Sequence, residues 1–168
     1  AGLDYDYRQA LKSENKASLE ELLFLRAFEK NNAKLAIMLE SSNYFIQHEH
    51  IPIRKHLVDN NLLDTIIFLP ENLFFATYLA PVLIICKQNR KIDEPITFIN
   101  AKNFIKIDKK KCRSFDIDRF INAFENNKED ISTYITKEQI INQDYKLNAS
   151  YCAQEKITPS KGQTIYLW

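Results

Sequence analysis

Two apolar runs with a helical stretch between them constrain the fold most. The runs KLAIML (34–39) and LLDTIIFL (62–69) are apolar on both faces, and IPIRKHLVDNN (51–61), which has helical spacing, lies between them. Strands that are apolar on both faces belong to sheets that helices cover on both sides. A helix between two strands also favours a parallel pair. We therefore predict an α/β fold with parallel strands at its centre.

A third apolar run, PVLIICKQ (81–88), follows the second after only a short loop. A parallel return needs a crossover about as long as a helix, so this pair is predicted to be antiparallel. PITFINA (95–101) is a further, more exposed strand candidate.

Helix signals precede and follow these strands. Ser18 and Glu21 form a capping box ahead of an apolar stripe that ends near residue 32. Beyond Lys102 the pattern predicts helices: one starts at Ser114 or Asp116, and a second capping box, Thr136 with Gln139, starts another. The stripe predicted to be buried on the first of these helices consists of Ile117, Phe120, Ile121 and Phe124.

These patterns divide the chain into three parts. Residues 1–106 are predicted to form a partial α/β domain, and residues 107–152 a helical extension packed on it. Residues 153–168 are predicted to be a linker or the beginning of a further element.

The chain holds only two glycines, Gly2 and Gly162. Loops that cradle a phosphate or a dinucleotide need glycine where the backbone approaches the ligand, so this chain contains no such loop. A net charge of +1 gives no global basic field, although Lys and Arg cluster at residues 107–113. No apolar run reaches the roughly 18 residues of a membrane span, and the acidic start is unlike a signal peptide. We expect a cytoplasmic protein that does not contact a membrane.

No metal site is expected. His48, His50 and His56 lack the i, i+4 histidine pair of a zinc protease helix. The three cysteines, Cys86, Cys112 and Cys152, are widely spaced and are interpreted as reduced thiols.

In open α/β sheets, ligands bind outside the carboxyl ends of the parallel strands. Two segments leave such ends here: residues 40–50 and the loop 71–81. The second segment carries Phe74, Phe75 and Thr77. The two Phe rings can stack on a flat heterocycle, or they can simply belong to the core, and the sequence leaves both interpretations open.

The order of short motifs from residue 18 to residue 152 resembles the later part of the modification subunit of type I restriction–modification systems, the N6-adenine DNA methyltransferases. An Ile-Arg helix leads to a strand that ends in Leu-Pro, followed by an Asn-Leu-Phe loop with Thr, a strand that ends in Lys, a Phe-Ile-Asn-Ala strand and an Asp-Tyr-x-Leu-Asn signature. The matching residues are Ile53, Arg54, Leu69, Pro70, Asn72, Leu73, Phe74, Thr77, Lys87, Phe98, Ile99, Asn100, Ala101, Asp144, Tyr145, Leu147 and Asn148.

The resemblance implies the second half of a methyltransferase-like, Rossmann-type mixed sheet with an antiparallel hairpin and a small helical C-terminal region. It also implies that Phe74, Phe75 and Thr77 line a pocket for a flipped target adenine. Lys109, Lys110, Lys111 and Arg113 become candidates for contact with DNA phosphates. The implied partners are DNA, the specificity and restriction subunits, and the missing N-terminal half.

Two family motifs do not occur in this chain: the Gly-rich loop for S-adenosylmethionine, and the Asn-Pro-Pro-aromatic motif that holds the target amino group. The family is adenine-specific DNA methyltransferase, but we expect this chain alone to bind no cofactor and to have no catalytic residue or activity. The family's Gly before the first strand and Leu-Pro after it are also absent. A degenerate methyltransferase-like module that binds DNA or another subunit is therefore the alternative. Activity through the His-rich turn is a third and weaker hypothesis.

Overall fold

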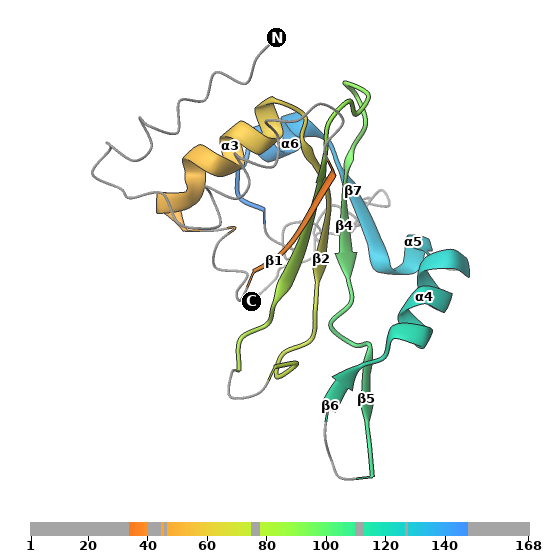
Figure 1. Cartoon of the computed structure of the whole chain (residues 1–168). Coiled ribbons are helices and arrows are strands. Elements are labelled where there is room, and N and C mark those ends of the chain that lie inside the picture. The colour runs from red at the N-terminus through yellow and green to blue at the C-terminus, as the bar shows by residue number, and fades with distance from the viewer. Residues whose placement is uncertain are drawn as a thin grey trace, which may run out of the picture.

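The computed structural model describes residues 34–39, 45, 47–74, 78–109, 113–126 and 128–147 (Figure 1). The strands are β1 (Lys34–Leu39), β2 (Leu63–Phe68), β3 (Val82–Lys87), β4 (Ile96–Asn100), β5 (Ile105–Ile107), β6 (Arg113–Phe115) and β7 (Ser132–Ile135). The helices are the short 3-10 turn η2 (His48–His50), α3 (Ile51–Asp59), α4 (Ile117–Asn126), α5 (Lys128–Ile131) and α6 (Lys137–Ile141). The helix predicted near residues 18–32, Asn148 and residues 153–168 lie outside the described residues.

The main sheet has the strand order β1-β3-β2-β4-β7. β3 runs antiparallel to both β1 and β2, and β4 runs parallel to β2. β1, β2 and β4 therefore point the same way and end at one edge of the sheet, called here the carboxyl edge. The mixed α/β class and the antiparallel pairing of β2 with β3 confirm the prediction. The sequence did not indicate that β3 inserts between β1 and β2.

Helices α3 and α6 cover one face of the sheet (Figure 1). Ile53, Leu57 and Val58 of α3 are buried, as their spacing predicts. The predicted capping box of Thr136 and Gln139 is present at the start of α6. Burial of each large apolar side chain contributes about 1.5–3 kcal/mol. This face holds more buried apolar residues than the other face, so it is the main core. The sheet residues in it are Leu39, Leu63, Ile66, Phe68, Val82, Ile84, Cys86, Ile96, Phe98 and Ile135.

Helix α4 lies on the opposite face, over a smaller core that includes Ile67 and Ile99. Phe120 of α4 is half-buried and packs edge-on against Phe104, with 5.4 Å between the ring centroids. The predicted stripe was only partly right, because Ile117, Ile121 and Phe124 are exposed. Phe120 and Ala123 are the α4 side chains that pack on this core, so the buried strip is narrower than the apolar spacing predicts.

The region beyond Lys102 was predicted as helical only, but its described residues include the strands β5, β6 and β7. β5 and β6 form a separate antiparallel hairpin, and β7 joins the main sheet antiparallel to β4. A strand of four residues between two helices is too short to show an alternating pattern, which is why β7 was missed. Residues 107–152 are therefore partly strand, while the division of the chain into domains stays a prediction.

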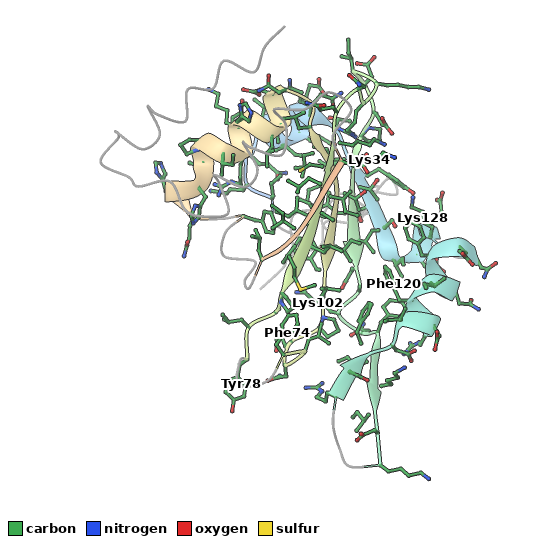
Figure 2. The ribbon with its side chains drawn as sticks, viewed as in Figure 1. Lys34, Phe74, Tyr78, Lys102, Phe120 and Lys128 are labelled. Carbon is green, nitrogen blue, oxygen red and sulfur yellow. The ribbon has the colours of Figure 1, made fainter. Side chains whose placement is uncertain are left out.

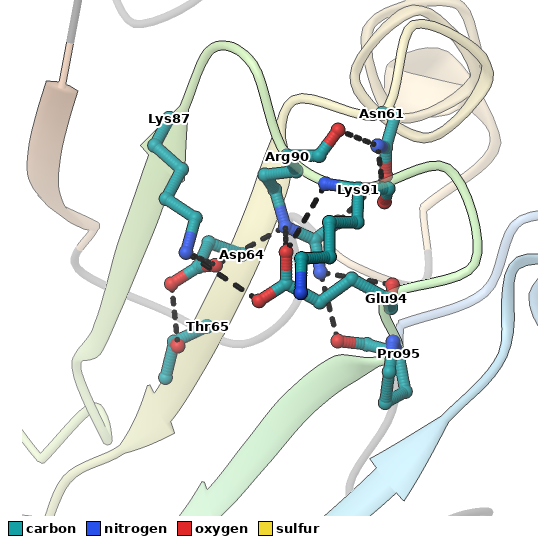
Figure 3. Close-up of polar contacts among 8 residues, drawn as sticks. All are labelled: Asn61, Asp64, Thr65, Lys87, Arg90, Lys91, Glu94 and Pro95. Carbon is teal, nitrogen blue, oxygen red and sulfur yellow. Dashed lines mark hydrogen bonds and ion pairs between the residues drawn. The ribbon is translucent and has the colours of Figure 1, made fainter.

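A polar network ties β2, β3 and β4 together at the end of the sheet opposite the carboxyl edge (Figure 3). The side chain of Arg90 is 1% exposed, and its Nε donates to Asp64 Oδ1 at 3.1 Å. Its Nη1 donates to Asn61 Oδ1 at 2.8 Å, and its Nη2 to the carbonyls of Glu94 and Pro95. Lys87 Nζ lies 2.9 Å from Asp64 Oδ1. The buried guanidinium thus has a counter-charge, and each of its three nitrogens donates a hydrogen bond.

Asp64 titrates under opposing influences. Partial burial alone would raise the pKa of its carboxyl, but hydrogen bonds from Lys87 and Thr65, with the charges of Lys87 and Arg90, outweigh burial and lower the pKa. The hydrogen bond to Asp64 in turn raises the pKa of Lys87. A carboxyl whose pKa is lower in the folded state stabilises the fold above its unfolded pKa, and that contribution is lost as pH falls through the folded pKa.

We predict that Asp64→Asn lowers the free energy of unfolding at pH 7 by about 2–3 kcal/mol, because Arg90 loses its buried counter-charge. The difference from wild type should shrink as pH falls below about 4, the ordinary pKa of an aspartate in the unfolded chain, and should vanish once pH is below the lowered pKa of Asp64 in the folded state. Urea unfolding between pH 3 and 7 measures this, with Asp93→Asn on the exposed neighbouring turn as the control. A difference that does not change with pH would contradict the assigned role.

Candidate functional site

The carboxyl edge brings together the segments that leave β2 and β4. Phe68 at the end of β2 pairs with Val82 of β3 on one side and with Asn100 of β4 on the other. The amide of Ala101 donates to the carbonyl of Phe68 at 2.9 Å, which extends the parallel pairing by one residue. The loop after β2 and the turn after β4 therefore begin side by side.

The loop after β2, residues 71–80, is called here the aromatic loop. Phe74 is 47% exposed and Tyr78 is 86% exposed, and Figure 2 shows both at the carboxyl edge. Asn72 turns the chain with a φ of 55°, a conformation that Asn tolerates better than most residues. Phe74 is therefore not a fully buried core residue of the described chain. Phe75 and Thr77, predicted as part of the same wall, lie outside the described residues.

Buried aromatic rings lie beneath this edge. The ring of Phe68 is 6.3 Å from that of Phe45 and 6.4 Å from that of Phe98, between ring centroids. The ammonium of Lys102, in the turn after β4, lies 6.0 Å from the centroid of Phe68. Phe68 is 3% exposed, so these rings form a rigid base for the exposed side chains above them.

Arg54 holds together two distant segments that carry resemblance residues. It is 1% exposed, and it donates from Nε to the carbonyl of Tyr145 at 2.8 Å and from Nη1 to the carbonyl of Gln47 at 2.9 Å. Tyr145 has a φ of 57°, and Arg54 binds its carbonyl in this otherwise unfavourable conformation. The Leu147 amide donates to the carbonyl of Phe45 at 3.1 Å. The resemblance had singled out Arg54, Tyr145 and Leu147, but it indicated neither their connection nor the part played by Gln47 and Phe45.

The hairpin β5–β6, residues 105–115, is called here the basic hairpin. Five of its eleven residues are Lys or Arg and one is acidic, whereas residues 116–131 carry five acids and two cations. Lys109 and Arg113 are exposed, while Lys110 and Lys111 lie outside the described residues. Ile107, 64% exposed, pairs with Arg113 across the hairpin. The segment between β4 and β7, residues 101–131, is called here the insertion. Its positive charge is concentrated on the basic hairpin, which projects beyond the sheet (Figure 1).

A cleft of about 530 Å³ lies between α4 and α5. Asp118 and Asp130 both line it, with Arg119 engaged over the ring of Phe104 at 5.3 Å. Two carboxylates make this cleft unsuitable for a phosphate. The carboxyl edge and the basic hairpin are therefore the better candidates for a nucleic-acid ligand.

Metal ligands and thiols are a further group of potentially reactive side chains in the described part of the chain. No three His, Cys, Asp or Glu residues there gather as metal ligands. Cys86 is a free thiol, and burial raises its pKa to about 12, so it stays protonated and unreactive. Cys112 and Cys152 lie outside the described residues.

None of the described helices is both long enough and apolar enough to span a lipid bilayer.

Comparison with known proteins identifies the family. The family model described as N-6 DNA Methylase matches residues 3–159. The chain belongs to the N-6 DNA methylase family. The type I restriction enzyme MpnII methylase subunit of Mycoplasma pneumoniae is 39% identical over 80 residues, which are 46% of this chain and 15% of that protein. The MjaVII methylase subunit of Methanocaldococcus jannaschii is 30% identical over 128 residues, or 70% of this chain and 22% of that protein.

The fold agrees with that of a solved N-6 methylase relative. The methyltransferase subunit of a type I restriction–modification system from Streptococcus thermophilus superposes with a TM-score of 0.66 and 25% identity, over 84% of this chain and 33% of that one. The chain thus spans between about a seventh and a third of the lengths of these relatives. It represents part of an N-6 methylase domain. This was predicted because the family's Gly-rich loop for S-adenosylmethionine does not occur in the chain.

We predict that two aromatic residues of this N-6 methylase segment differ in how much they contribute to stability. Phe74→Ala should change the free energy of unfolding by less than about 1 kcal/mol, because the ring is largely exposed. Phe68→Ala should cost about 3–5 kcal/mol, because it leaves a cavity between Phe45 and Phe98. Urea unfolding of both variants decides the matter, and equal losses would show that the aromatic loop belongs to the core.

Proposed function

We propose that this chain is the target-base side of an N6-adenine DNA methyltransferase, the modification subunit of a type I restriction–modification system. The observation that carries the proposal is the exposed Phe74 on the aromatic loop, at the carboxyl edge of a sheet in the N-6 methylase family. Such edges are where α/β folds bind ligands. The protein then works in the cytoplasm, on DNA.

The aromatic loop supplies one wall of the base pocket. Enzymes that modify a base extrude it from the duplex and hold it between aromatic or apolar side chains. Phe74 offers its open ring for stacking, and Phe75 and Thr77 complete the wall. The buried rings of Phe45, Phe68 and Phe98 keep the edge beneath it rigid.

The basic hairpin contacts the DNA backbone. Lys109 and Arg113 are exposed there, and Lys110 and Lys111 come between them in sequence. Cations on phosphates supply affinity without sequence preference, because each one releases a condensed counterion. The acids of α4 and α5 lie on the other part of this insertion, so the duplex runs past the hairpin rather than over these helices.

The methyl donor is bound elsewhere in the complete enzyme. S-adenosylmethionine supplies the methyl group in this family, but the two glycines of this chain give it no cradle. The residues present do not fit the cofactor, so this chain alone is inactive. The missing N-terminal half supplies the donor loop and the Asn-Pro-Pro-aromatic motif, and the specificity and restriction subunits complete the assembly.

A degenerate methyltransferase-like module that binds DNA or a subunit is the second candidate. It is favoured by the residues around the first strand, where Asn31 and Asn32 precede it and MLESSNYF (38–45) follows it in place of the family's Gly and Leu-Pro. This alternative keeps the hairpin contacts and loses methyl transfer.

The first test uses the complete subunit in its assembly, with methyl transfer to adenine N6 in DNA as the readout. Phe74→Ala should weaken target-base binding by about 1–3 kcal/mol, the range for a lost stacking contact, and lower kcat/KM accordingly. Phe74→Trp should retain most of the activity. Tyr134→Ala is the matched control, because Tyr134 is 45% exposed on β7, away from the carboxyl edge. If the wild-type assembly transfers no methyl group, the degenerate module is favoured. If the Phe74→Ala variant is as active as wild type, the aromatic loop does not form part of the base pocket.

The second test addresses the basic hairpin. Replacing Lys109 and Arg113 together by Ala should lower DNA affinity and reduce the slope of log affinity against log salt concentration by about two. Lys34 and Lys91, exposed at the opposite end of the sheet, give the matched double variant, whose slope should equal that of wild type. Equal slopes for both double variants would show that the hairpin does not bind phosphates.

A further inference from the structure

The carboxyl edge is poor in cations. Three segments leave the ends of β1, β2 and β4, namely residues 40–50, 69–81 and 101–104, and Lys102 is the single Lys or Arg among them. Glu71, by contrast, is exposed on the aromatic loop. A nucleotide bound at this edge meets the negative charge of Glu71, and Lys102 is the cation on these three segments that can offset it.

Hydrogen bonds hold the turn that carries Lys102 in place. Its amide donates to Asn100 Oδ1 at 3.2 Å, and the turn that carries it is closed by a bond from the Phe104 amide to the Ala101 carbonyl at 3.1 Å. The ammonium lies 6.0 Å from the centroid of the buried Phe68 ring, while the residue as a whole stays exposed. A lysine on a hydrogen-bonded turn, with its ammonium over a buried ring, presents its charge at a defined place and loses little further freedom on binding.

Lys102 and Phe74 follow neighbouring strands. Asn100 of β4 pairs with Phe68 of β2, so Lys102 comes two residues beyond this pair on one strand and Phe74 six residues beyond it on the other. Neighbouring strands are about 4.8 Å apart, so a single nucleotide is large enough to span both segments. Figure 2 shows both side chains at this end of the sheet.

We propose that Lys102 binds the phosphate that flanks the target adenine while the aromatic loop holds the base. The inference rests on the proposed function and adds a residue that the resemblance does not indicate. Extrusion of a base rotates its sugar and phosphates out of the duplex path. A fixed cation at the pocket mouth stabilises that rotated backbone, whereas the basic hairpin contacts the undistorted duplex. Lys102 is a binding and positioning residue and takes no part in proton or methyl transfer.

The experiment uses the complete assembly and a DNA duplex with one adenine site, located by mapping the N6-methyladenine that the assembly produces. Lys102→Met removes the charge and keeps an unbranched side chain of similar length at an exposed position, so the fold should be preserved. Its affinity should fall roughly tenfold, and its salt slope should decrease by about one. Lys102→Arg should retain most of the affinity. Lys128→Met is the matched control. The ammonium of Lys128 also lies over a Phe ring, 4.7 Å from the centroid of Phe124, but it belongs to α5 and not to the carboxyl edge.

Each phosphate beside the target adenine is then replaced, one at a time, by a neutral methylphosphonate, and the DNA affinities of the wild-type and Lys102→Met assemblies are compared. At one of these positions, the wild-type assembly should lose roughly tenfold in affinity, and the Lys102→Met assembly should lose nothing further. An unchanged salt slope, or equal sensitivity of both proteins at both positions, would overturn the inference. If Phe74→Ala impairs methyl transfer while Lys102→Met behaves as wild type, only the Lys102 contact is wrong. If Lys102→Met shows the expected loss while Phe74→Ala is fully active, the proposed base wall is wrong and the phosphate contact remains.

Discussion

Burial of β2 on both faces is the constraint on which the rest of the structure depends. Ile66 is fully buried toward α3 and α6, and Ile67 is 8% exposed toward the opposite core. The strand also has a hydrogen-bonded neighbour on each edge, β3 and β4. A shift by one residue would exchange the two faces and break both registers, so the position of its carboxyl end is fixed. The aromatic loop begins at that end, and its location follows from the core.

The two ends of the sheet serve different purposes. At one end, the Asp64–Arg90 network joins β2, β3 and β4 through partly buried ionic hydrogen bonds, which fix the register at a distance from the proposed site. At the carboxyl edge, Phe74, Tyr78 and Lys102 are exposed and contribute little to folding. Separating the stabilising contacts from the exposed groups allows the edge to vary without loss of the fold. The same separation recurs in the insertion between β4 and β7, where acids gather on the helices and cations on the hairpin.

Much of the fold was predictable because the signals were local. The apolar runs gave β1, β2 and β3, the proline and the stripe gave α3, and the capping box gave α6. The pairing of β1 with β3 was not predictable, because nothing in either strand specifies which neighbour it takes. β5, β6 and β7 were missed because three or four residues cannot show a period, and the helical stripe of α4 indicated more burial than the exposed Ile117 and Ile121 have.

The candidate site was predictable only in part. Phe74 was predicted as a candidate because the carboxyl ends of parallel strands are a general ligand position and because the loop resembles that of a known family, and its exposure agrees with that prediction. Lys102 was not found, because a single lysine in a polar turn has no signal until the parallel register of β2 and β4 places it beside the loop. The hydrogen bond between Arg54 and Tyr145 was also not predictable, because 91 positions separate the two residues in sequence and only the folded chain brings them together.

Photocrosslinking tests the central claim, that the carboxyl edge holds the target adenine, most directly. A benzophenone amino acid replaces Phe74 in the complete assembly, and the DNA is illuminated while bound and then sequenced around the adduct. The account predicts adducts confined to the target adenine and its immediate neighbours, and none from the same group placed at Tyr134. Adducts to protein alone, or to DNA several base pairs from the methylated adenine, would contradict it.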